Sequence, residues 1–234
     1  MTPLRIAIAG ADGRMGQALV RAIGEDDGFA LAGTLLRESG SGEGNRATAL
    51  KDVDAVIDFT APDSSVQLSR VTSELKLPHV IGTTGFSAEQ DAQISAAARQ
   101  TAIVKSGNMS VGITLLAALV KQAASALPDF DIQILEMHHR AKVDAPSGTA
   151  LLLGDAAAKA RNTPRDSIGI ASLRGGTVTG EHAVIFAGPQ ERLVLSHTAE
   201  DRIIFARGAV AAARWLQGKP PGLYTMADVL GLSA

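Results

Sequence analysis

The sequence contains no cysteine and very few aromatic residues. One tryptophan, one tyrosine and six phenylalanines make up 3% of its 234 residues. The absence of cysteine excludes disulfide bonds and thiolate chemistry, and it fits a reducing compartment. The scarcity of aromatic side chains argues against a surface that stacks nucleic-acid bases.

The chain also lacks a surplus of basic residues and a long hydrophobic run. Its net charge is -2 and its pI is about 6.2, and lysine and arginine form no continuous stripe. These features argue against nucleic acid as a partner. The first apolar run is interrupted at Gly10 and Asp12, which is typical of neither a signal peptide nor a membrane span. We therefore expect a cytoplasmic protein with no membrane partner.

The first half of the sequence alternates short apolar runs with segments of helical periodicity. Hydrophobic residues make up 46% of the chain, enough for one large core or two small ones. The repeated βα pattern predicts an α/β fold with a parallel, Rossmann-like sheet. The predicted strands are 4–9, 29–36, 55–59, 79–81 and 102–104, and the predicted helices are 14–23, 64–74 and 88–99.

The second half has a different pattern, in which the later strands follow one another without helices between them. This pattern predicts a smaller α+β domain with a mixed or antiparallel sheet. The predicted helices are 111–126, 148–160 and 201–216, and the predicted strands are 131–137, 171–173, 183–187 and 192–196.

A glycine-rich turn, Gly10-Ala11-Asp12-Gly13-Arg14-Met15-Gly16, lies between the first predicted strand and helix. Its G-x-x-G-x-x-G spacing is a variant of the dinucleotide-binding fingerprint. The first glycine permits a tight turn, the second lets the backbone approach a pyrophosphate, and the third lets helix and strand pack closely. The turn predicts a nicotinamide dinucleotide site, and an ordinary tight βα turn is the alternative.

The end of the second predicted strand should select the cofactor. An acidic residue there binds the ribose hydroxyl of NAD, whereas an arginine accommodates the 2′-phosphate of NADP. Here Leu36 is followed by Arg37 and Glu38. Arg37, assisted by Arg14, favours NADPH. Glu38 leaves NADH open, and a solvated surface arginine is the alternative reading of Arg37.

Two further loops of small residues follow predicted strands, at the carboxyl ends where open α/β sheets bind ligands. They are Gly82-Thr83-Thr84-Gly85 and Ser106-Gly107-Asn108-Met109. Small residues there let a nicotinamide ribose come close, although each tetrapeptide alone is a generic loop.

A cluster of proton-transfer residues follows the strand predicted at 131–137. It contains His138, His139 and Lys142. Histidine moves protons near neutral pH, and lysine holds a carboxylate or supplies a proton. A zinc site is disfavoured because His138, His139 and Asp144 lack a usual ligand spacing and lysine and arginine lie among them.

An anion site is predicted directly after this cluster, where Ser147-Gly148-Thr149 begins a helix. Ser147 is a candidate N-cap, and the N–H groups of a helix N-terminus bind a carboxylate or phosphate. Taken singly, these residues have plainer readings: a polar strand end, a surface lysine and a simple cap. Their occurrence within a dozen residues favours an active site for a small anion.

Several motifs occur in a definite order along the chain. They are the turn 10–16, Ile57-Asp58-Phe59-Thr60, Gly82-Thr83-Thr84-Gly85, Asn108-Met109-Ser110-Val111-Gly112, the block 136–151, Gly180-Glu181-His182 and Phe205-Ala206-Arg207-Gly208-Ala209. In this order the chain resembles the 4-hydroxy-tetrahydrodipicolinate reductase (dihydrodipicolinate reductase) family of diaminopimelate and lysine biosynthesis. The resemblance covers nearly the whole chain, and the pattern H-H-x-x-K-x-D-A-P-S-G-T is its most specific part.

The resemblance implies that a nicotinamide cofactor reduces a cyclic, dicarboxylated, unsaturated imine to tetrahydrodipicolinate. It implies that His138 is the general acid, that Lys142 also donates a proton and that His139 contacts the substrate. The segment Ser147-Gly148-Thr149 would bind a substrate carboxylate. The cofactor would be lined by residues 10–15, 82–84 and 106–109.

The resemblance also implies a homotetramer formed through the sheet of the second domain, and a last helix that returns to the nucleotide domain. We therefore assign residues 1–109 and 206–234 to a dinucleotide-binding domain. Residues 110–205 would form the substrate-binding and oligomerisation domain.

The chain departs from the family pattern in three places. Leu36 replaces a commonly acidic residue, Met109 stands where phenylalanine is common, and the loop 38–51 is short. Two other functions remain as alternatives. One is another small two-domain NAD(P) dehydrogenase that acts on an amino acid. The other is a protein that binds NAD(P) as a sensor, without turnover.

Overall fold

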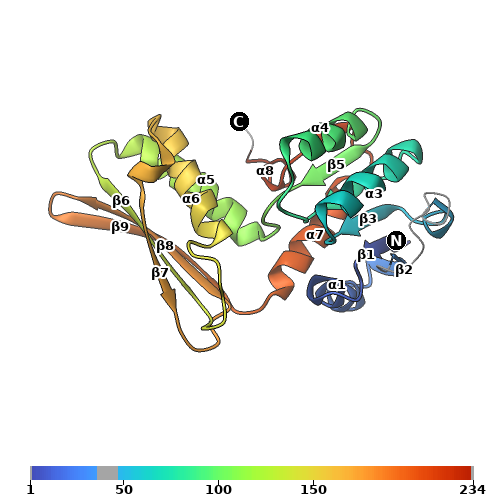
Figure 1. Ribbon diagram of the computed structural model, residues 1–234, viewed down its shortest axis with the longest axis horizontal. Helices are drawn as coiled ribbons and strands as arrows, with labels where there is room; N and C mark the ends of the chain where they lie inside the picture. The colour runs from blue at the N-terminus through green and yellow to red at the C-terminus, as the bar shows by residue number, and fades with distance from the viewer. Residues whose placement is uncertain (1, 36–46, 233–234) are drawn as a thin grey trace. The chain divides into compact units, whose positions relative to one another are not determined.

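The structure is a computed structural model that describes residues 2–35 and 47–232 of the chain. The chain forms two compact units (Figure 1). Unit 1 contains the chain up to Ser110 and the segment that returns from Ile203, and unit 2 is Val111–Arg202. The predicted Leu36, Arg37 and Glu38, together with most of the loop 38–51, lie outside the described residues.

Unit 1 is built on a parallel sheet, as predicted, and this sheet has six strands. In the strand order β10-β5-β4-β3-β1-β2, the chain goes from β1 to β2 on one side and then crosses to β3 on the other side of β1. The reversal beside β1 is a topological switch point. The strands are β1 (Leu4–Ala9), β2 (Phe29–Leu35), β3 (Ala55–Asp58), β4 (His79–Ile81), β5 (Ala102–Lys105) and β10 (Gly222–Tyr224).

Helices cover both faces of this sheet (Figure 1). The two-residue period of β1 sends Ile6 and Ile8 into the core beneath α1 and α7, and it sends Ala7 and Ala9 into the core beneath α3. Because both faces are buried, these strands are almost continuously apolar. The helices are α1 (Arg14–Gly24), α3 (Pro62–Glu74), α4 (Ala88–Ala97), α7 (Ile203–Trp215) and α8 (Met226–Val229).

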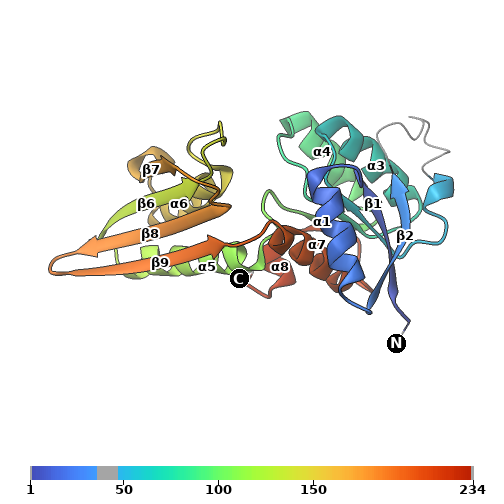
Figure 2. The ribbon, with the colours of Figure 1, turned by 90° about the horizontal axis from the view of Figure 1, so that it is seen from below.

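Unit 2 is a mixed four-stranded sheet with two helices. The order is β7-β6-β8-β9, in which β6 and β7 are parallel and the other pairs are antiparallel. β8 and β9 form a long hairpin (Figure 2). The elements are α5 (Val111–Ala126), β6 (Asp131–His138), α6 (Gly148–Arg161), a 3-10 turn (Arg165–Ser167), β7 (Gly169–Arg174), β8 (Gly180–Gly188) and β9 (Glu191–Ala199).

One face of the unit 2 sheet is covered by α5 and α6, and the other carries exposed apolar side chains. Ile132 and Ile134 of β6 join the core with the helices, whereas Leu135, which follows Ile134, is 37% exposed. Leu173 of β7 and Val194 of β9 lie on this same outer face and are also exposed. The alternation of β6 therefore divides a buried face from an apolar outer face.

The predicted fold class is confirmed, and most predicted elements agree with the structure to within two residues. Three differences matter. β6 extends to His138 and ends there, so His139 lies beyond the strand and strand alternation does not set its direction. β10 and α8 were not predicted. β10 is only three residues long, and α8 is a single turn that is capped by Thr225 and Asp228.

Candidate active site

The loops that follow four parallel strands of unit 1 begin at the same edge of the sheet. The register aligns Ala9 with Asp58, Asp58 with Ile81, and Ile81 with Lys105. The glycine turn, Phe59-Thr60, Gly82-Thr83-Thr84 and Ser106 therefore follow neighbouring strand ends. This edge includes the switch point beside β1, where open α/β sheets bind nucleotides.

The glycine turn has the backbone that a dinucleotide site needs. Gly10 has a φ of 79°, which side-chain-bearing residues rarely adopt. A Cβ on Gly16 would collide with the carbonyl of Gly10 and the backbone of Ala11, so only glycine permits this contact between helix and turn. α1 begins at Arg14, and its N-cap residue is Gly13. Within the described chain, no side chain makes a capping hydrogen bond at this end of the helix. The turn therefore fits a pyrophosphate bound by backbone N–H groups.

The buried carboxylate of Asp58 orders the loops that follow β3 and β4. The sequence did not predict this role of Asp58. Oδ1 of Asp58 accepts hydrogen bonds from the N–H (2.9 Å) and the hydroxyl (2.6 Å) of Thr60. The hydroxyl of Thr83 accepts from the N–H of Thr60 (3.0 Å) and from Ser65 (2.9 Å). Burial opposes the charged form of Asp58, but the nearby His79 and these hydroxyls hold its pKa below the usual range.

The loop after β5 is tied to itself and to the core. The hydroxyl of Ser106 donates to the carbonyl of Asn108 (2.7 Å), and the side-chain oxygen of Asn108 accepts from the N–H of Ser110 (2.9 Å). The Met109 side chain is only 2% exposed and packs in the core of unit 1. Its carbonyl lies against Gly208 of α7, where a Cβ would collide. The Met109 side chain therefore belongs to the core, and Ser106, Gly107 and Asn108 are left as the candidate cofactor-binding residues of this loop.

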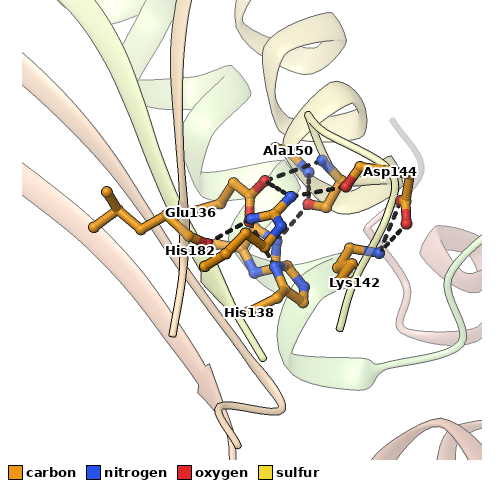
Figure 3. A network of polar contacts seen from close by, with 9 residues as sticks. Glu136, His138, Lys142, Asp144, Ala150 and His182 are labelled. Carbon is orange, nitrogen blue, oxygen red and sulfur yellow. Dashed lines mark hydrogen bonds and ion pairs between the residues drawn. The ribbon is translucent and has the colours of Figure 1, made fainter. Parts of the chain in front are cut away.

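In unit 2 the predicted histidine lies in a network centred on a buried carboxylate (Figure 3). Glu136 is 0% exposed, and Oε2 accepts from Nδ1 of His138 at 2.5 Å. Arg174 donates to both carboxylate oxygens, each at 2.9 Å. The N–H of Ser147 donates to Oε1 at 3.2 Å. Burial by itself raises the pKa of Glu136, but hydrogen bonds from Arg174, Ser172 and His138 outweigh it and lower the pKa to about 2.

The register of three strands assembles this network. Along β6, Glu136 and His138 follow Ile132 and Ile134 on the buried face. Across the parallel pair, Glu136 lies beside Ser172 and His138 beside Arg174 of β7. Across the antiparallel pair, Glu136 lies beside His182 of β8. The polar cluster thus lies on the same face of the sheet as the hydrophobic core, at the end of β6 that carries Glu136 and His138.

A second buried histidine, His182, lies against the first. The two rings are edge to face, with centroids 5.1 Å apart. Nε2 of His182 is 3.0 Å from the hydroxyl of Ser147, and its Nδ1 has no partner among the described residues. Burial, together with the nearby His138, lowers the pKa of His182 to about 4. His182 is therefore neutral near pH 7 and adds no charge beside His138.

The turn after β6 carries Lys142. Its ammonium is paired with both oxygens of Asp144 at 2.8 Å, and its side chain is 20% exposed. The N–H of Gly175 donates to the carbonyl of His138 (2.9 Å), and Arg174 donates to the carbonyl of Asp144 (2.7 Å). The end of β7 therefore holds both ends of the segment that presents Lys142. His139 is half-buried at the start of this segment.

The N-terminus of α6 follows immediately. The Ser147 hydroxyl accepts from the N–H of Ala150 (3.2 Å), which makes Ser147 the N-cap, as predicted. Gly148 is exposed, and a Cβ on it would meet no described heavy atom within 4 Å. Open space therefore adjoins the backbone at the positive end of the helix, where a carboxylate is stabilised. Thr149 is the next residue of the same first turn.

Sequence reasoning missed Glu136, Arg174 and His182 as functional residues. The signal for Glu136 was present, because it lies two residues before His138 on a predicted strand and so shares its face. Arg174 is 38 residues from Glu136, and only the register of β6 and β7 brings them together. Among residues 2–35 and 47–232, no group of three or more potential metal ligands occurs. No helix in that part of the chain is long and apolar enough to cross a membrane.

Comparisons with known proteins match the chain to one family. The family model described as "Dihydrodipicolinate reductase, N-terminus" matches residues 4–109. The model described as "Dihydrodipicolinate reductase, C-terminus" matches residues 112–230. Together the two models span nearly the whole chain, and their boundary falls where unit 1 gives way to unit 2.

Curated relatives and solved structures agree with this match. The 4-hydroxy-tetrahydrodipicolinate reductase of Afipia carboxidovorans is 51% identical over 270 aligned residues, covering 100% of this chain and 99% of the relative. That of Brucella abortus is 51% identical, covering 97% of this chain and 99% of the relative. A dipicolinate-bound dihydrodipicolinate reductase from Paenisporosarcina sp. TG-14 has the same fold, with a TM-score of 0.84 at 23% identity over 97% of this chain and 98% of that one. A probable dehydrogenase from Thermotoga maritima shares the fold more distantly, with a TM-score of 0.62 at 10% identity over 98% of this chain and 93% of that one.

Proposed function

Because this chain belongs to the 4-hydroxy-tetrahydrodipicolinate reductase (dihydrodipicolinate reductase) family, we propose that its His138 cluster is where the reduced substrate ring receives a proton. The chain is an NAD(P)H-dependent oxidoreductase that reduces 4-hydroxy-tetrahydrodipicolinate in diaminopimelate and lysine biosynthesis. One observation carries the proposal: a mostly buried imidazole, held at Nδ1 by an ionised carboxylate, lies beside the N-cap of α6.

The substrate is a small dicarboxylate that would be held at the start of α6 and by Lys142. One carboxylate would accept from the N–H of Gly148 and the first turn that includes Thr149, where the open backbone and the helix dipole favour an anion. The structural neighbour from Paenisporosarcina is described as bound to dipicolinate, a planar dicarboxylate. His139 would add a contact from the turn between β6 and α6, and Ser147 orders the helix start.

His138 and Lys142 would supply the proton that follows hydride addition. Loss of the 4-hydroxyl group as water leaves a conjugated, unsaturated imine. When this imine accepts the hydride, the adjacent ring atom becomes electron-rich, and protonating that atom completes the reduction. His138 would donate from Nε2, because its Nδ1 is engaged by Glu136. Lys142 would neutralise a carboxylate as it binds and donate a proton in turn. Its partner Asp144 is 63% exposed, so a substrate carboxylate can replace it at low cost.

The nicotinamide cofactor would be held at the edge of the unit 1 sheet, and it supplies a hydride when bound. Residues 10–15 would hold its pyrophosphate through backbone N–H groups at the start of α1. Thr83 and Thr84, with Ser106, Gly107 and Asn108, would line its nicotinamide half. The hydrogen bonds from Asp58 through Thr60 to Thr83 keep the second of these loops in place.

We propose NADPH as the preferred cofactor. The proposal depends on Arg37, which follows the position where an acidic residue would select NADH, and on the exposed Arg14 at the start of α1. Steady-state kinetics with both cofactors should give a higher kcat/KM for NADPH. Arg37→Ala should reduce that ratio mainly through the KM for NADPH, whereas Arg70→Ala, on the exposed side of α3, should not. A clear preference for NADH in the unaltered chain would overturn the proposal.

The assigned reaction predicts NAD(P)H oxidation that depends on product freshly made by the preceding synthase of the pathway. Absorbance loss at the nicotinamide band should begin only when synthase, its substrates and this chain are all present. Turnover with aspartate or homoserine derivatives but not with the synthase product would favour an amino-acid dehydrogenase. Cofactor binding without turnover on any of them would favour a sensor.

The outer face of the unit 2 sheet supports a homotetramer. Leu135, Leu173 and Val194 leave this face apolar and exposed, and such a patch on a sheet favours burial against another copy. We propose that four chains associate through it in the cytoplasm.

A further inference from the structure

We propose that Glu136 is a positioning residue that determines which nitrogen of His138 carries the donated proton. This inference rests on the proposed role of His138 as the general acid. Glu136 itself does not touch the substrate. It acts through the imidazole, whose Nδ1 it binds, so that Nε2 is the nitrogen left for the substrate.

The carboxylate of Glu136 is held in place by three donors. Arg174 binds both oxygens in a two-point arrangement, with each distance 2.9 Å. The backbone N–H of Ser147 adds a third donor at 3.2 Å. The side chain is 0% exposed, so water does not compete for these bonds. A buried carboxylate with this set of donors stays ionised and accepts hydrogen bonds only.

The fixed carboxylate determines where the imidazole ring of His138 carries its proton. A carboxylate that can only accept requires a proton on the Nδ1 that faces it, 2.5 Å from Oε2. When the ring gives up one proton, the Nδ1–H is retained, and the proton that leaves comes from Nε2. The N–H bond at Nε2 breaks as the new bond to the substrate ring forms. The neutral ring is then the Nδ1–H tautomer, ready to take a proton at Nε2 again.

The space around Nε2 of His138 is left open by a glycine. A Cβ on Gly180 would lie 3.0 Å from this nitrogen, so the glycine leaves room there that any other residue would fill. The ring keeps 11% of its side-chain exposure. The neighbouring His182 is neutral and presents an edge-to-face contact, so it does not repel a protonated His138. Glu136 therefore orients the ring, and Gly180 keeps its outer nitrogen accessible.

The test is the tautomer of His138, read from ¹⁵N chemical shifts of histidine-labelled protein. The chain has only five histidines, and the spectrum of His138→Gln identifies the resonances of this ring. At a pH where the ring is neutral, the unaltered protein should show a protonated Nδ1 and a bare Nε2. In Glu136→Gln the amide oxygen should turn to Arg174 and the amide N–H should face His138. That arrangement reverses the tautomer and places the proton on Nε2.

The change of tautomer in Glu136→Gln should be accompanied by a loss of activity. Glu136→Gln should lower kcat on the order of 100-fold with little change in the KM for substrate, because the carboxylate acts through the ring rather than on the ligand. Glu181→Gln is the matched control. It makes the same change at an exposed residue of β8 in register with Met137, and it should leave the tautomer and kcat as they are.

Three results would overturn the inference: an Nε2–H tautomer in the unaltered protein, an unchanged tautomer in Glu136→Gln, or a kcat close to normal in that variant. If Glu136→Gln does not fold, the spectrum of the unaltered protein still decides, together with Glu136→Asp, which keeps the charge but moves it away from Nδ1. The proposed function fails in a different way. If His138→Gln keeps its activity while the Nδ1–H tautomer is present, Glu136 orients a ring that is not the general acid.

Discussion

Replacing His138 with glutamine is expected to lower kcat by about 10²–10⁴-fold while the protein stays folded, the loss typical of a general acid. The imidazole is held at Nδ1 by Glu136, and the N–H group of a glutamine amide can make a similar bond. The substitution therefore leaves no buried carboxylate without a donor, and Arg174 still binds both of its oxygens. What is removed is the proton at Nε2. Rates at saturating substrate and cofactor, with thermal melting as the check on folding, measure the effect.

His197→Gln is the matched control for this experiment. His197 lies directly across from His182 on the β8–β9 hairpin, and its Nδ1 has no partner in the described part of the chain. The same substitution there should keep most of the activity. Affinity for a dicarboxylate probe such as dipicolinate, measured by calorimetry, should be similar in both variants. A kcat for His138→Gln within tenfold of normal would remove His138 as the general acid.

The second large effect is expected at Lys142. Lys142→Met should lower kcat/KM by about 10²–10⁴-fold. The reason is that we propose two roles for this side chain: it donates a proton, and its positive charge binds a substrate carboxylate. Its ammonium is 2.8 Å from both oxygens of Asp144, so the cation is already held in place before substrate arrives. Loss of binding should raise KM, and loss of the proton donor should lower kcat.

Lys142→Arg separates these two roles. Arginine keeps the cation and binds carboxylates well, but it does not give up a proton in a protein. We expect the KM to return towards normal while kcat stays low. Lys159→Met, an exposed lysine in the last turn of α6, is the control for loss of one positive charge. If arginine restores both parameters, Lys142 serves binding alone.

The fold was largely predictable because its signals are local. The central strands β1, β3 and β4 of unit 1 are buried on both faces, so they stand out as short apolar runs between helical segments. α5 and β4 have the predicted bounds, Val111–Ala126 and His79–Ile81. β10 escaped prediction because its three residues, Gly222–Tyr224, carry no such run. They are a strand only because they pair with β5 at the edge of the sheet.

The candidate site was predictable only in part. The glycine turn and the block from His138 to Thr149 are contiguous in sequence, so their chemistry could be read along the chain. The partners that control this chemistry are remote. Arg174 reaches Glu136 across β6 and β7, and Thr83 is joined to Thr60 across β3 and β4. No periodicity within one segment reports such a pairing.

The sequence by itself determined the α/β fold class and the family, and it singled out His138 and Lys142 as the candidate proton-transfer residues. These follow from local periodicity and from motifs whose members are neighbours in the chain. Only the tertiary structure decided that a buried carboxylate, Glu136, faces Nδ1 of His138 and is itself held by Arg174. The physical reason is strand register: a shift of one residue would turn Arg174 to the opposite face of the sheet. That alignment depends on packing over the whole of unit 2.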